Sequence, residues 1–93
     1  MAVGVIGWEL EVVGSQSLKD KRRVVKSLKD RLHQRFNISV AETAHHELWQ
    51  RAGLTACVAA ADARHAERVL DEADRFVHSD PRARVIRAER SYV

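Results

Sequence analysis

Residues 2–32 read AVGVIGWELEVVGSQSLKDKRRVVKSLKDRL, and the hydrophobic period of this stretch changes once, from that of a strand to that of a helix. Through residues 2–13, apolar side chains such as Trp8 alternate with polar or small ones such as Glu9, as in a strand with one buried face. Farther along, apolar residues recur every three, four or seven positions, which places them on one stripe of a helix. The stretch therefore predicts a strand over residues 2–13 followed by a helix over residues 18–35.

The helix has a clear start signal and one apolar side. Ser17 precedes its first residue and Asp20 follows three positions later, an arrangement in which both side chains accept hydrogen bonds from free backbone N–H groups. The residues expected to form the apolar stripe are Leu18, Val25, Leu28 and Leu32. These signals predict an amphipathic helix that packs against a sheet.

The rest of the chain continues the alternation between strands and helices. We expect a second strand from Phe36 to Ala41, a third from Leu54 to Ala61, a second helix capped by Asp62 and ended before Ser79, and a last strand from Arg84 to Tyr92. A connection of about ten residues joins the second and third strands. The order β-α-β-β-α-β predicts a ferredoxin-like α+β domain, a four-stranded antiparallel sheet with both helices on one face. The other face is then open or covered by another subunit.

Length and composition agree with one small domain. The 93 residues, 45% of them hydrophobic, supply one core, because domains usually have about 100–150 residues. No apolar run approaches the roughly 20 residues of a membrane span, and residues 1–14 lack the pattern of an export signal. The single cysteine, Cys57, cannot form an internal disulfide, and it lies in an apolar run, which predicts a buried small side chain. We expect a single cytoplasmic domain over residues 1–93.

Two motifs connect the chain with a known family. SLKDKRRVVKSLKDRLHQRFNISVAE, from Ser17 to Glu42, and ELWQRA, from Glu47 to Ala52, closely resemble the YlxP-like family of small bacterial proteins of unknown function. The resemblance spans essentially the whole chain and implies a ferredoxin-like fold, a bacterial cytoplasmic setting, and genes often located beside those of translation and ribosome-maturation factors. It implies no catalytic residues. Where family members commonly carry an acidic residue, a histidine and a polar residue, this chain has Ala44, His45 and His46.

The distribution of charge is more informative than the net charge of +3. Residues 18–35 contain eight lysines and arginines against two aspartates, so the remainder of the chain is slightly acidic. At about 100° per residue, six basic side chains fall on one arc away from the apolar stripe. This predicted basic ridge consists of Lys19, Arg22, Arg23, Lys26, Lys29 and His33.

Two interpretations of the basic ridge remain open, a binding surface for an anion and a merely solvated helix face. Charges of opposite sign interleave along the second helix, as solubility alone favours, whereas the ridge has one such pair, Lys26 with Asp30. The cations in or just after the first turn are Lys19, Lys21, Arg22 and Arg23. There the helix dipole disfavours each cation by about 0.3–1 kcal/mol but attracts a phosphate. We therefore expect the ridge to bind anions.

The connection between the second and third strands offers a further candidate contact. The adjacent side chains of His45 and His46 diverge and lack a metal-binding spacing, so no metal site is expected. Leu48 and Trp49 either pack on a neighbouring element or contact a ligand. In the second case, Trp49 can stack on a base while Arg51 binds its phosphate.

No enzyme motif is present, and we expect neither catalysis nor a cofactor. There is no glycine-rich phosphate loop, no nucleophile elbow and no pair of carboxylates placed by a catalytic motif. Glu9 and Glu11 share a strand face and are expected to be solvated or paired with Arg87.

Two functions from different classes follow from the sequence. The first is an RNA-binding or ribosome-associated protein that uses the basic ridge, helped by Trp49 and Arg51. The second is a structural or regulatory module that self-associates through the open sheet face, with the basic helix serving solubility. Val3, Val5 and Val13 on that face favour contact with another subunit.

Overall fold

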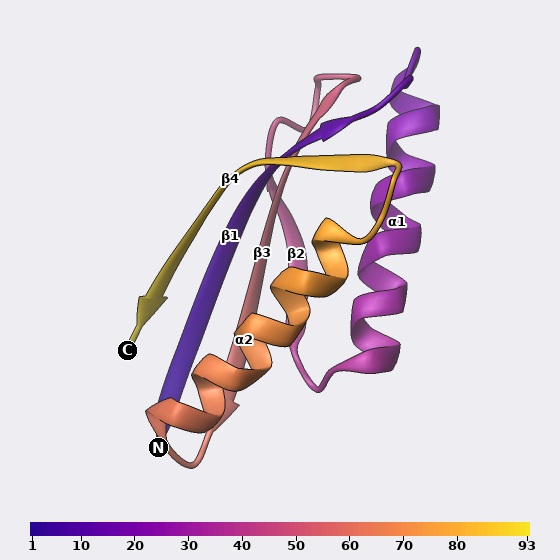
Figure 1. Ribbon diagram of the computed structural model, residues 1–93. Coiled ribbons are helices and arrows are strands. Elements are labelled where there is room, and N and C mark those ends of the chain that lie inside the picture. Colours follow the sequence, from indigo (N-terminus) through magenta and orange to yellow (C-terminus); the bar gives the residue numbers. More distant parts are fainter.

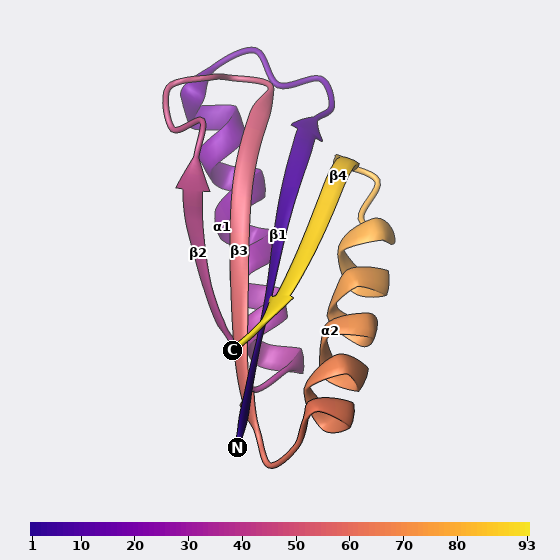
Figure 2. The same ribbon diagram turned by 90° about the vertical axis from the view of Figure 1, so that its left-hand side faces the viewer.

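The computed structural model describes all residues, 1–93, and contains six elements in the predicted order (Figure 1). They are β1 (Ala2–Val12), α1 (Leu18–Arg35), β2 (Ser39–Ala44), β3 (Arg51–Ala60), α2 (Ala63–His78) and β4 (Ala83–Tyr92). The strands form one antiparallel sheet in the order β2-β3-β1-β4, so β1 and β3 are central. Both helices cover the same face of the sheet, α1 mainly over β2 and α2 mainly over β1 (Figure 2). The predicted ferredoxin-like arrangement is confirmed.

The start of α1 follows the predicted cap. Ser17 has an extended backbone, and its Oγ accepts a hydrogen bond from the N–H of Asp20 at 3.0 Å. The Asp20 carboxylate accepts in turn from the N–H of Gln16 at 3.2 Å, one residue before the cap. Three side chains of the predicted apolar stripe are buried, namely Val25, Leu28 and Leu32. The fourth, Leu18, is half-buried. Neither helix is long and apolar enough to cross a membrane.

The core lies between the helices and one face of the sheet. The inward side chains of β1 are at most 2% exposed; they are Ile6, Trp8, Leu10 and Val12. Trp8 keeps its polar atom satisfied, because its indole N–H donates to Asp74 of α2 at 2.8 Å. Gly4 lets α2 come close to β1, since a Cβ at this position would lie 3.0 Å from the Leu70 side chain. Burial of alternate residues leaves the other face of β1 without a covering layer.

The hairpin between β2 and β3 is tighter than the sequence predicted. β3 begins at Arg51, three residues earlier than expected, so the connection is only residues 45–50. The register of the two strands shifts next to Ala44, and a Cβ on Gly53 would lie 2.7 Å from the Cβ of Ala44. Only glycine allows the strands to approach so closely, which the pattern of a single strand does not reveal.

The strand β2 starts at Ser39, three residues later than predicted. Phe36 instead caps the C-terminus of α1, and its N–H still donates to the carbonyl of Leu32 at 2.9 Å. Ile38 and Val40 are nevertheless buried, as the alternation of this segment predicted. The inward residues were therefore recognised correctly although the strand boundary was not.

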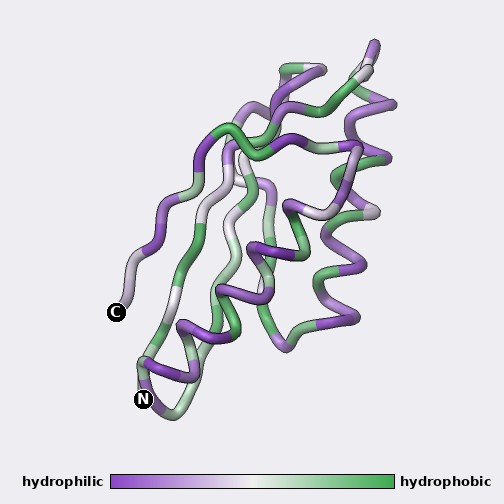
Figure 3. Tube along the Cα trace, in the orientation of Figure 1, coloured by the Kyte–Doolittle hydropathy of each residue, from purple (hydrophilic) through white to green (hydrophobic).

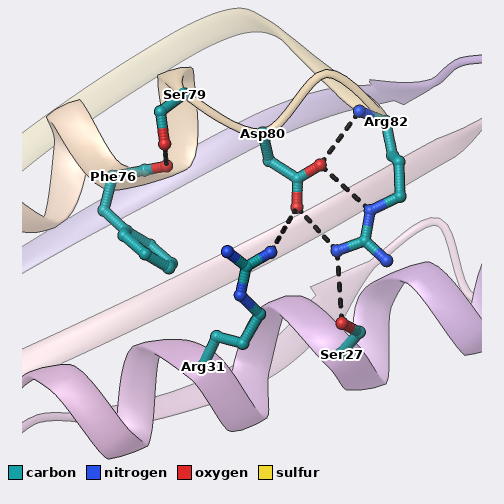
Figure 4. A network of polar contacts seen from close by, with 6 residues as sticks. All are labelled: Ser27, Arg31, Phe76, Ser79, Asp80 and Arg82. Atoms are coloured by element: carbon teal, nitrogen blue, oxygen red, sulfur yellow. Dashed lines mark hydrogen bonds and ion pairs between the residues drawn. The ribbon is translucent and has the colours of Figure 1, made fainter.

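A buried carboxylate fixes the turn between α2 and β4 onto α1 (Figure 4). The Asp80 side chain is 3% exposed and accepts hydrogen bonds from Nε and Nη2 of Arg82 at 3.0 and 2.7 Å. The same guanidinium donates to Oγ of Ser27 in α1 at 3.2 Å. The hydrogen bonds from Arg82 hold the pKa of Asp80 below its usual value. The carboxylate is therefore ionised near neutral pH.

Replacing this carboxylate tests its contribution to stability. Asp80→Asn removes the charge that Arg82 faces, and we expect the free energy of unfolding near neutral pH to fall by about 2 kcal/mol. Because the folded pKa of Asp80 is lowered, its contribution is present above the unfolded pKa of about 3.9 and is lost as pH falls through the folded value. Urea unfolding from neutral pH down to about pH 3 should show a larger loss in the wild type than in the variant, because the acid loss from the other carboxylates is common to both.

The control for this experiment is Asp30→Asn, which removes a carboxylate from an exposed ion pair on α1. It should shift the urea midpoint much less than Asp80→Asn does, because exposed ion pairs contribute little to stability. Equal urea midpoints for the wild type and Asp80→Asn would contradict the role given to the buried carboxylate.

Candidate functional site

The predicted basic ridge lies on the side of α1 that faces away from the sheet. Five of its six side chains are exposed, and Lys29 is half-buried. Only Lys26 has a carboxylate within 4.0 Å, that of Asp30 at 2.7 Å, and this hydrogen bond lowers the pKa of Asp30. Figure 3 shows the hydrophilic colour along the outer turns of α1. The ridge side chains without an acidic partner are Lys19, Arg22, Arg23, Lys29 and His33.

The position of these cations along the helix strengthens their attraction for an anion. Lys19, Arg22 and Arg23 lie in the first two turns, where free N–H groups and the helix dipole are already positive. Asp20 is the only acidic residue of the first turn, and its carboxylate binds the N–H of Gln16. The N-terminal half of α1 therefore joins side-chain cations to a positive helix end, a combination that helix stability does not favour.

Lys21 does not belong to this exposed group, although the sequence placed it with the first-turn cations. Its side chain is fully buried, and its Nζ donates to the carbonyl oxygens of His45 and His46 at 2.7 and 3.2 Å. Oε2 of Glu42, buried and without a hydrogen bond, lies 3.2 Å from the same nitrogen as an ion pair. These contacts offset the cost of burying the ammonium and tie the β2–β3 hairpin to α1. Lys21 is therefore not one of the first-turn cations that an external anion could meet.

The turn 45–50 presents two apolar side chains to solvent. Its far end is fixed by the side chain of Gln50, which donates to the carbonyl of Ser15 at 3.2 Å. Leu48 and Trp49 are 48% and 54% exposed, so neither packs into the core. Trp49 is therefore displayed on a braced turn at the same end of the molecule as the N-terminus of α1 (Figure 1).

Arg51 lies apart from the basic ridge, on the open face of the sheet. It belongs to β3, and its Nη1 donates to Oε1 of Glu9 in β1 at 3.1 Å. The same oxygen lies 2.9 Å from Nε2 of His45. Arg87, the expected partner of Glu9, pairs instead with Glu89 at 3.4 Å. The sheet thus separates Arg51 from the helix cations, and the structure does not bring these predicted site residues together.

The histidines of the turn and the cysteine do not form a ligand set. Nε2 of His46 faces the carbonyl of Glu42 at 3.1 Å, whereas His45 faces the open side of the sheet. No group of three histidine, cysteine or acidic side chains is close enough to hold a metal ion. Cys57 is half-buried opposite Val5 on the open face of the sheet. The prediction that it lies in the core is therefore wrong, because its two neighbours along β3 are the residues that point into the core.

Sequence reasoning missed a second group of arginines. Arg31 and Arg35 of α1 face α2, and their guanidinium carbons lie 5.3 and 5.4 Å from the centre of the Phe76 ring. The only signal in the sequence is that these two arginines are one helical turn apart. Phe76 is far along the chain, so helical spacing alone did not reveal the contact.

The sheet topology and the exposed cationic helix define a small ferredoxin-like α+β protein whose first helix carries half of the lysines and arginines. The chain belongs to the family described as "Protein of unknown function (DUF503)", which matches residues 3–90. It is 28% identical over 79 residues to the "Uncharacterized protein YlxP" of Bacillus subtilis (strain 168), a match that covers 85% of this chain and 86% of that protein. The resemblance to YlxP-like proteins is thereby confirmed.

The likeness to one solved structure supports the fold alone. The de novo designed protein Foldit4 is similar with a TM-score of 0.53 and 16% identity, over 100% of this chain and 97% of Foldit4. The de novo designed protein Ferredog-Diesel has a TM-score of 0.46 and 11% identity, over 98% of this chain and 83% of that protein. At such identity, the likeness to Foldit4 shows how the elements are arranged and says nothing of function.

The buried ammonium can be tested by Lys21→Met, which keeps most of the side-chain volume and leaves the carbonyls of His45 and His46 without their donor. We expect the free energy of unfolding to fall by about 3 kcal/mol. Amide hydrogen exchange in the turn 45–50 should accelerate more than exchange in α2. Lys19→Met makes the same change at an exposed position and should cost less than about 0.5 kcal/mol. Similar losses in both variants would show that Lys21 does not brace the turn.

Proposed function

We propose that the protein is a non-catalytic RNA-binding protein, associated with the ribosome or with another RNA particle, and that it binds through the basic ridge of α1. The observation that carries the proposal is the exposure of the ridge cations on one helix face, with an acidic partner only for Lys26. A face that served only solubility would carry charges of both signs. From Lys19 to His33 the ridge extends over about 20 Å of helix, enough for several phosphates.

Trp49 supports an unpaired strand of RNA as the partner. Its half-exposed ring lies at the end of the molecule where Lys19 and Arg22 are found, on the turn that Lys21 braces. An exposed indole offers a stacking surface to an unpaired base, worth about 1–3 kcal/mol per base. Arg51 is left out of this surface because its guanidinium binds Glu9 on the other side of the sheet.

Binding of this kind tolerates different RNA sequences. Contacts to phosphates position a protein on nucleic acid without identifying its bases. Stacking on one indole is also tolerant, because every base has a flat face. The gene neighbourhood implied by the resemblance to YlxP-like proteins agrees with a partner of the translation machinery.

Neutralising the ridge tests the proposal directly. The variant carries glutamine at five positions, Lys19, Arg22, Arg23, Lys26 and Lys29. Its binding to a single-stranded RNA at about 0.1 M salt should be weaker by at least about tenfold. The slope of log K against log salt should flatten by about 0.7 for each phosphate that the variant no longer binds. Fluorescence anisotropy of labelled RNA over a salt series measures both effects, and circular dichroism should show an unchanged fold because the apolar stripe is intact.

The control is Arg64→Gln combined with Arg68→Gln, which removes two cations where the ridge variant removes five. Both arginines are exposed on α2 and lie outside the ridge. RNA affinity should change by less than about twofold. Equal losses in the control and in the ridge variant, or no loss in the ridge variant, would contradict the proposal.

A second candidate function, self-association, is supported by the open face of the sheet. At one end of this face the paired positions of β1 and β3 bear no charge, namely Val3 with Ala59, Val5 with Cys57, and Gly7 with Thr55. Neither backbone angles nor packing require Gly7, since a Cβ there would meet nothing closer than 3.9 Å. A glycine within a strand often marks a close approach by another surface.

The charges at the other end of this face also favour a second copy of the chain, rather than RNA, as the partner that covers the face. Each glutamate is paired within the chain, Glu9 with Arg51, Glu11 with Arg84 and Glu89 with Arg87. A two-fold axis parallel to the strands and midway between β1 and β3 would lay β1 of one copy over β3 of the other. Val5 of each copy would then face Cys57 of its partner, and the hollow at Gly7 would receive Thr55 of its partner.

Sedimentation equilibrium tests the second candidate. The wild type should approach twice its chain mass of 10.5 kDa at about 0.2 mM protein. Val5→Glu should shift the population to monomer, because it places a charge in the uncharged part of the face. The sequence placed Val13 on this face as well, but Val13 lies beyond the end of β1 and is 57% exposed, which corrects that expectation. Val13→Glu makes the same substitution there, and this variant should associate as the wild type does. A wild type that stays monomeric at about 0.5 mM would remove this candidate.

A further inference from the structure

A groove lies between the C-terminal halves of α1 and α2, and its volume is about 630 Å³. Its lining includes three arginines, two phenylalanines and one acid, namely Arg31, Arg35, Arg75, Phe36, Phe76 and Glu72. Ligand sites in proteins usually have volumes of about 300–1,000 Å³, so this groove can hold a whole small molecule. None of its residues belongs to the basic ridge.

The two phenylalanine rings form the apolar part of the groove. Phe36 and Phe76 meet edge to face, with ring centres 6.0 Å apart and planes at 78°. The guanidinium carbons of Arg31 and Arg35 lie within 5.4 Å of the centre of the Phe76 ring, and Figure 4 shows Arg31 beside that ring. Cation–π contacts orient a guanidinium through its planar face and do not use its N–H groups. The arginines are thus held in place while hydrogen-bond donors stay available to a ligand.

The positive charge of the groove is only partly compensated. Arg35 and Arg75 have no carboxylate within 4.0 Å. Nη1 of Arg31 lies 3.7 Å from Oδ2 of Asp80, but that oxygen already accepts a hydrogen bond from Arg82 at 2.7 Å. Helix dipoles favour Arg35 and Arg75 in the last turns of their helices. The dipoles explain neither Arg31 nor the packing of Arg31 and Arg35 on the Phe76 ring.

We propose that this groove binds a nucleotide, as a site separate from the basic ridge. One guanidinium group can bind two oxygens of a phosphate group at once. Three guanidinium groups around one groove can therefore hold more than one phosphate group. A flat base stacks on phenylalanine rings and on guanidinium planes. Inorganic phosphate would use the arginines and not the rings, whereas a nucleoside di- or triphosphate uses both.

The groove and the ridge occupy different flanks of α1. At about 100° per residue, Arg31 and Arg35 point away from the arc that holds Lys19 and His33. The other wall of the groove comes from α2, which lies beside α1 on the same face of the sheet (Figure 2). A bound mononucleotide therefore needs no ridge residue, and the site does not depend on RNA binding.

Calorimetric titration of the full chain with ATP, pyrophosphate and adenosine tests the site. ATP should bind with a Kd of about 0.1 mM or tighter, and at least about tenfold more tightly than either of the other two. The variant Arg35→Gln with Arg75→Gln should bind ATP at least about tenfold more weakly. Amide NMR shifts induced by ATP should concentrate at residues 31–36 and 72–79.

Two controls separate this site from general attraction to positive charge. Arg64→Gln with Arg68→Gln removes the same amount of charge from the outer side of α2 and should change the ATP affinity by less than about twofold. The glutamine variant of the ridge should also bind ATP normally. Since Arg35→Gln removes a contact with Phe76, the single variant Arg75→Gln repeats the test without that change.

Several outcomes of the titrations with the groove variants and their controls would overturn the proposal. They are no heat of ATP binding at about 5 mM, equal affinities for ATP and pyrophosphate, equal losses in the groove and control variants, and an unchanged affinity in Arg75→Gln. Loss of RNA binding in the ridge variant with ATP binding intact would support two separate sites. ATP binding that disappears with the ridge would instead assign the nucleotide to α1 and contradict the groove.

Discussion

The strand β1 buries every second side chain, from Ile6 to Val12, and the arrangement of the whole molecule follows from this constraint. Because only one face of the sheet is apolar throughout, both helices must pack on it. α2 covers the central strand and α1 lies mainly over β2, so α1 keeps its outer side free along its whole length. The open sheet face and the outer side of α1 therefore lie on opposite sides of the protein. One flat partner cannot cover both.

Within this framework, Lys21 holds the end of the β2–β3 hairpin against α1. A buried ammonium is costly unless polar groups surround it. Here two carbonyls of the hairpin accept its hydrogen bonds, and the carboxylate of Glu42 is its ion-pair partner. The N-cap at Ser17 sets the start of α1, and the hydrogen bonds from Lys21 fix the turn 45–50 relative to this end of the helix. The exposed ring of Trp49 is thereby held near the positive end of the helix, although its exposure contributes nothing to the core.

The sequence predicted the features that depend on neighbours along the chain. The caps at Ser17 and Asp62 and the exposed ridge each rest on residues within a turn or two, and the structure confirms them. Lys21 and Arg51 were misplaced because their partners belong to other elements. Helical or strand periodicity shows that a side chain lies outside the apolar stripe of its element, but it does not show whether a distant loop covers that side chain. The early start of β3 was missed for a similar reason, since it depends on how closely two strands approach.

The three candidate surfaces differ in how far their charges are compensated, and this difference determines which of them an anion meets first. On the open sheet face each glutamate has an arginine partner, so that face adds little net field. In the groove, Arg31 is shared with Asp80, whereas Arg35 and Arg75 have no carboxylate within 4.0 Å. On the ridge only Lys26 is compensated, while the rest of the chain is slightly acidic. Because long-range attraction follows uncompensated charge, the proposed RNA partner would be oriented toward α1 before any contact forms, and the groove would act only on ligands small enough to enter between the helices.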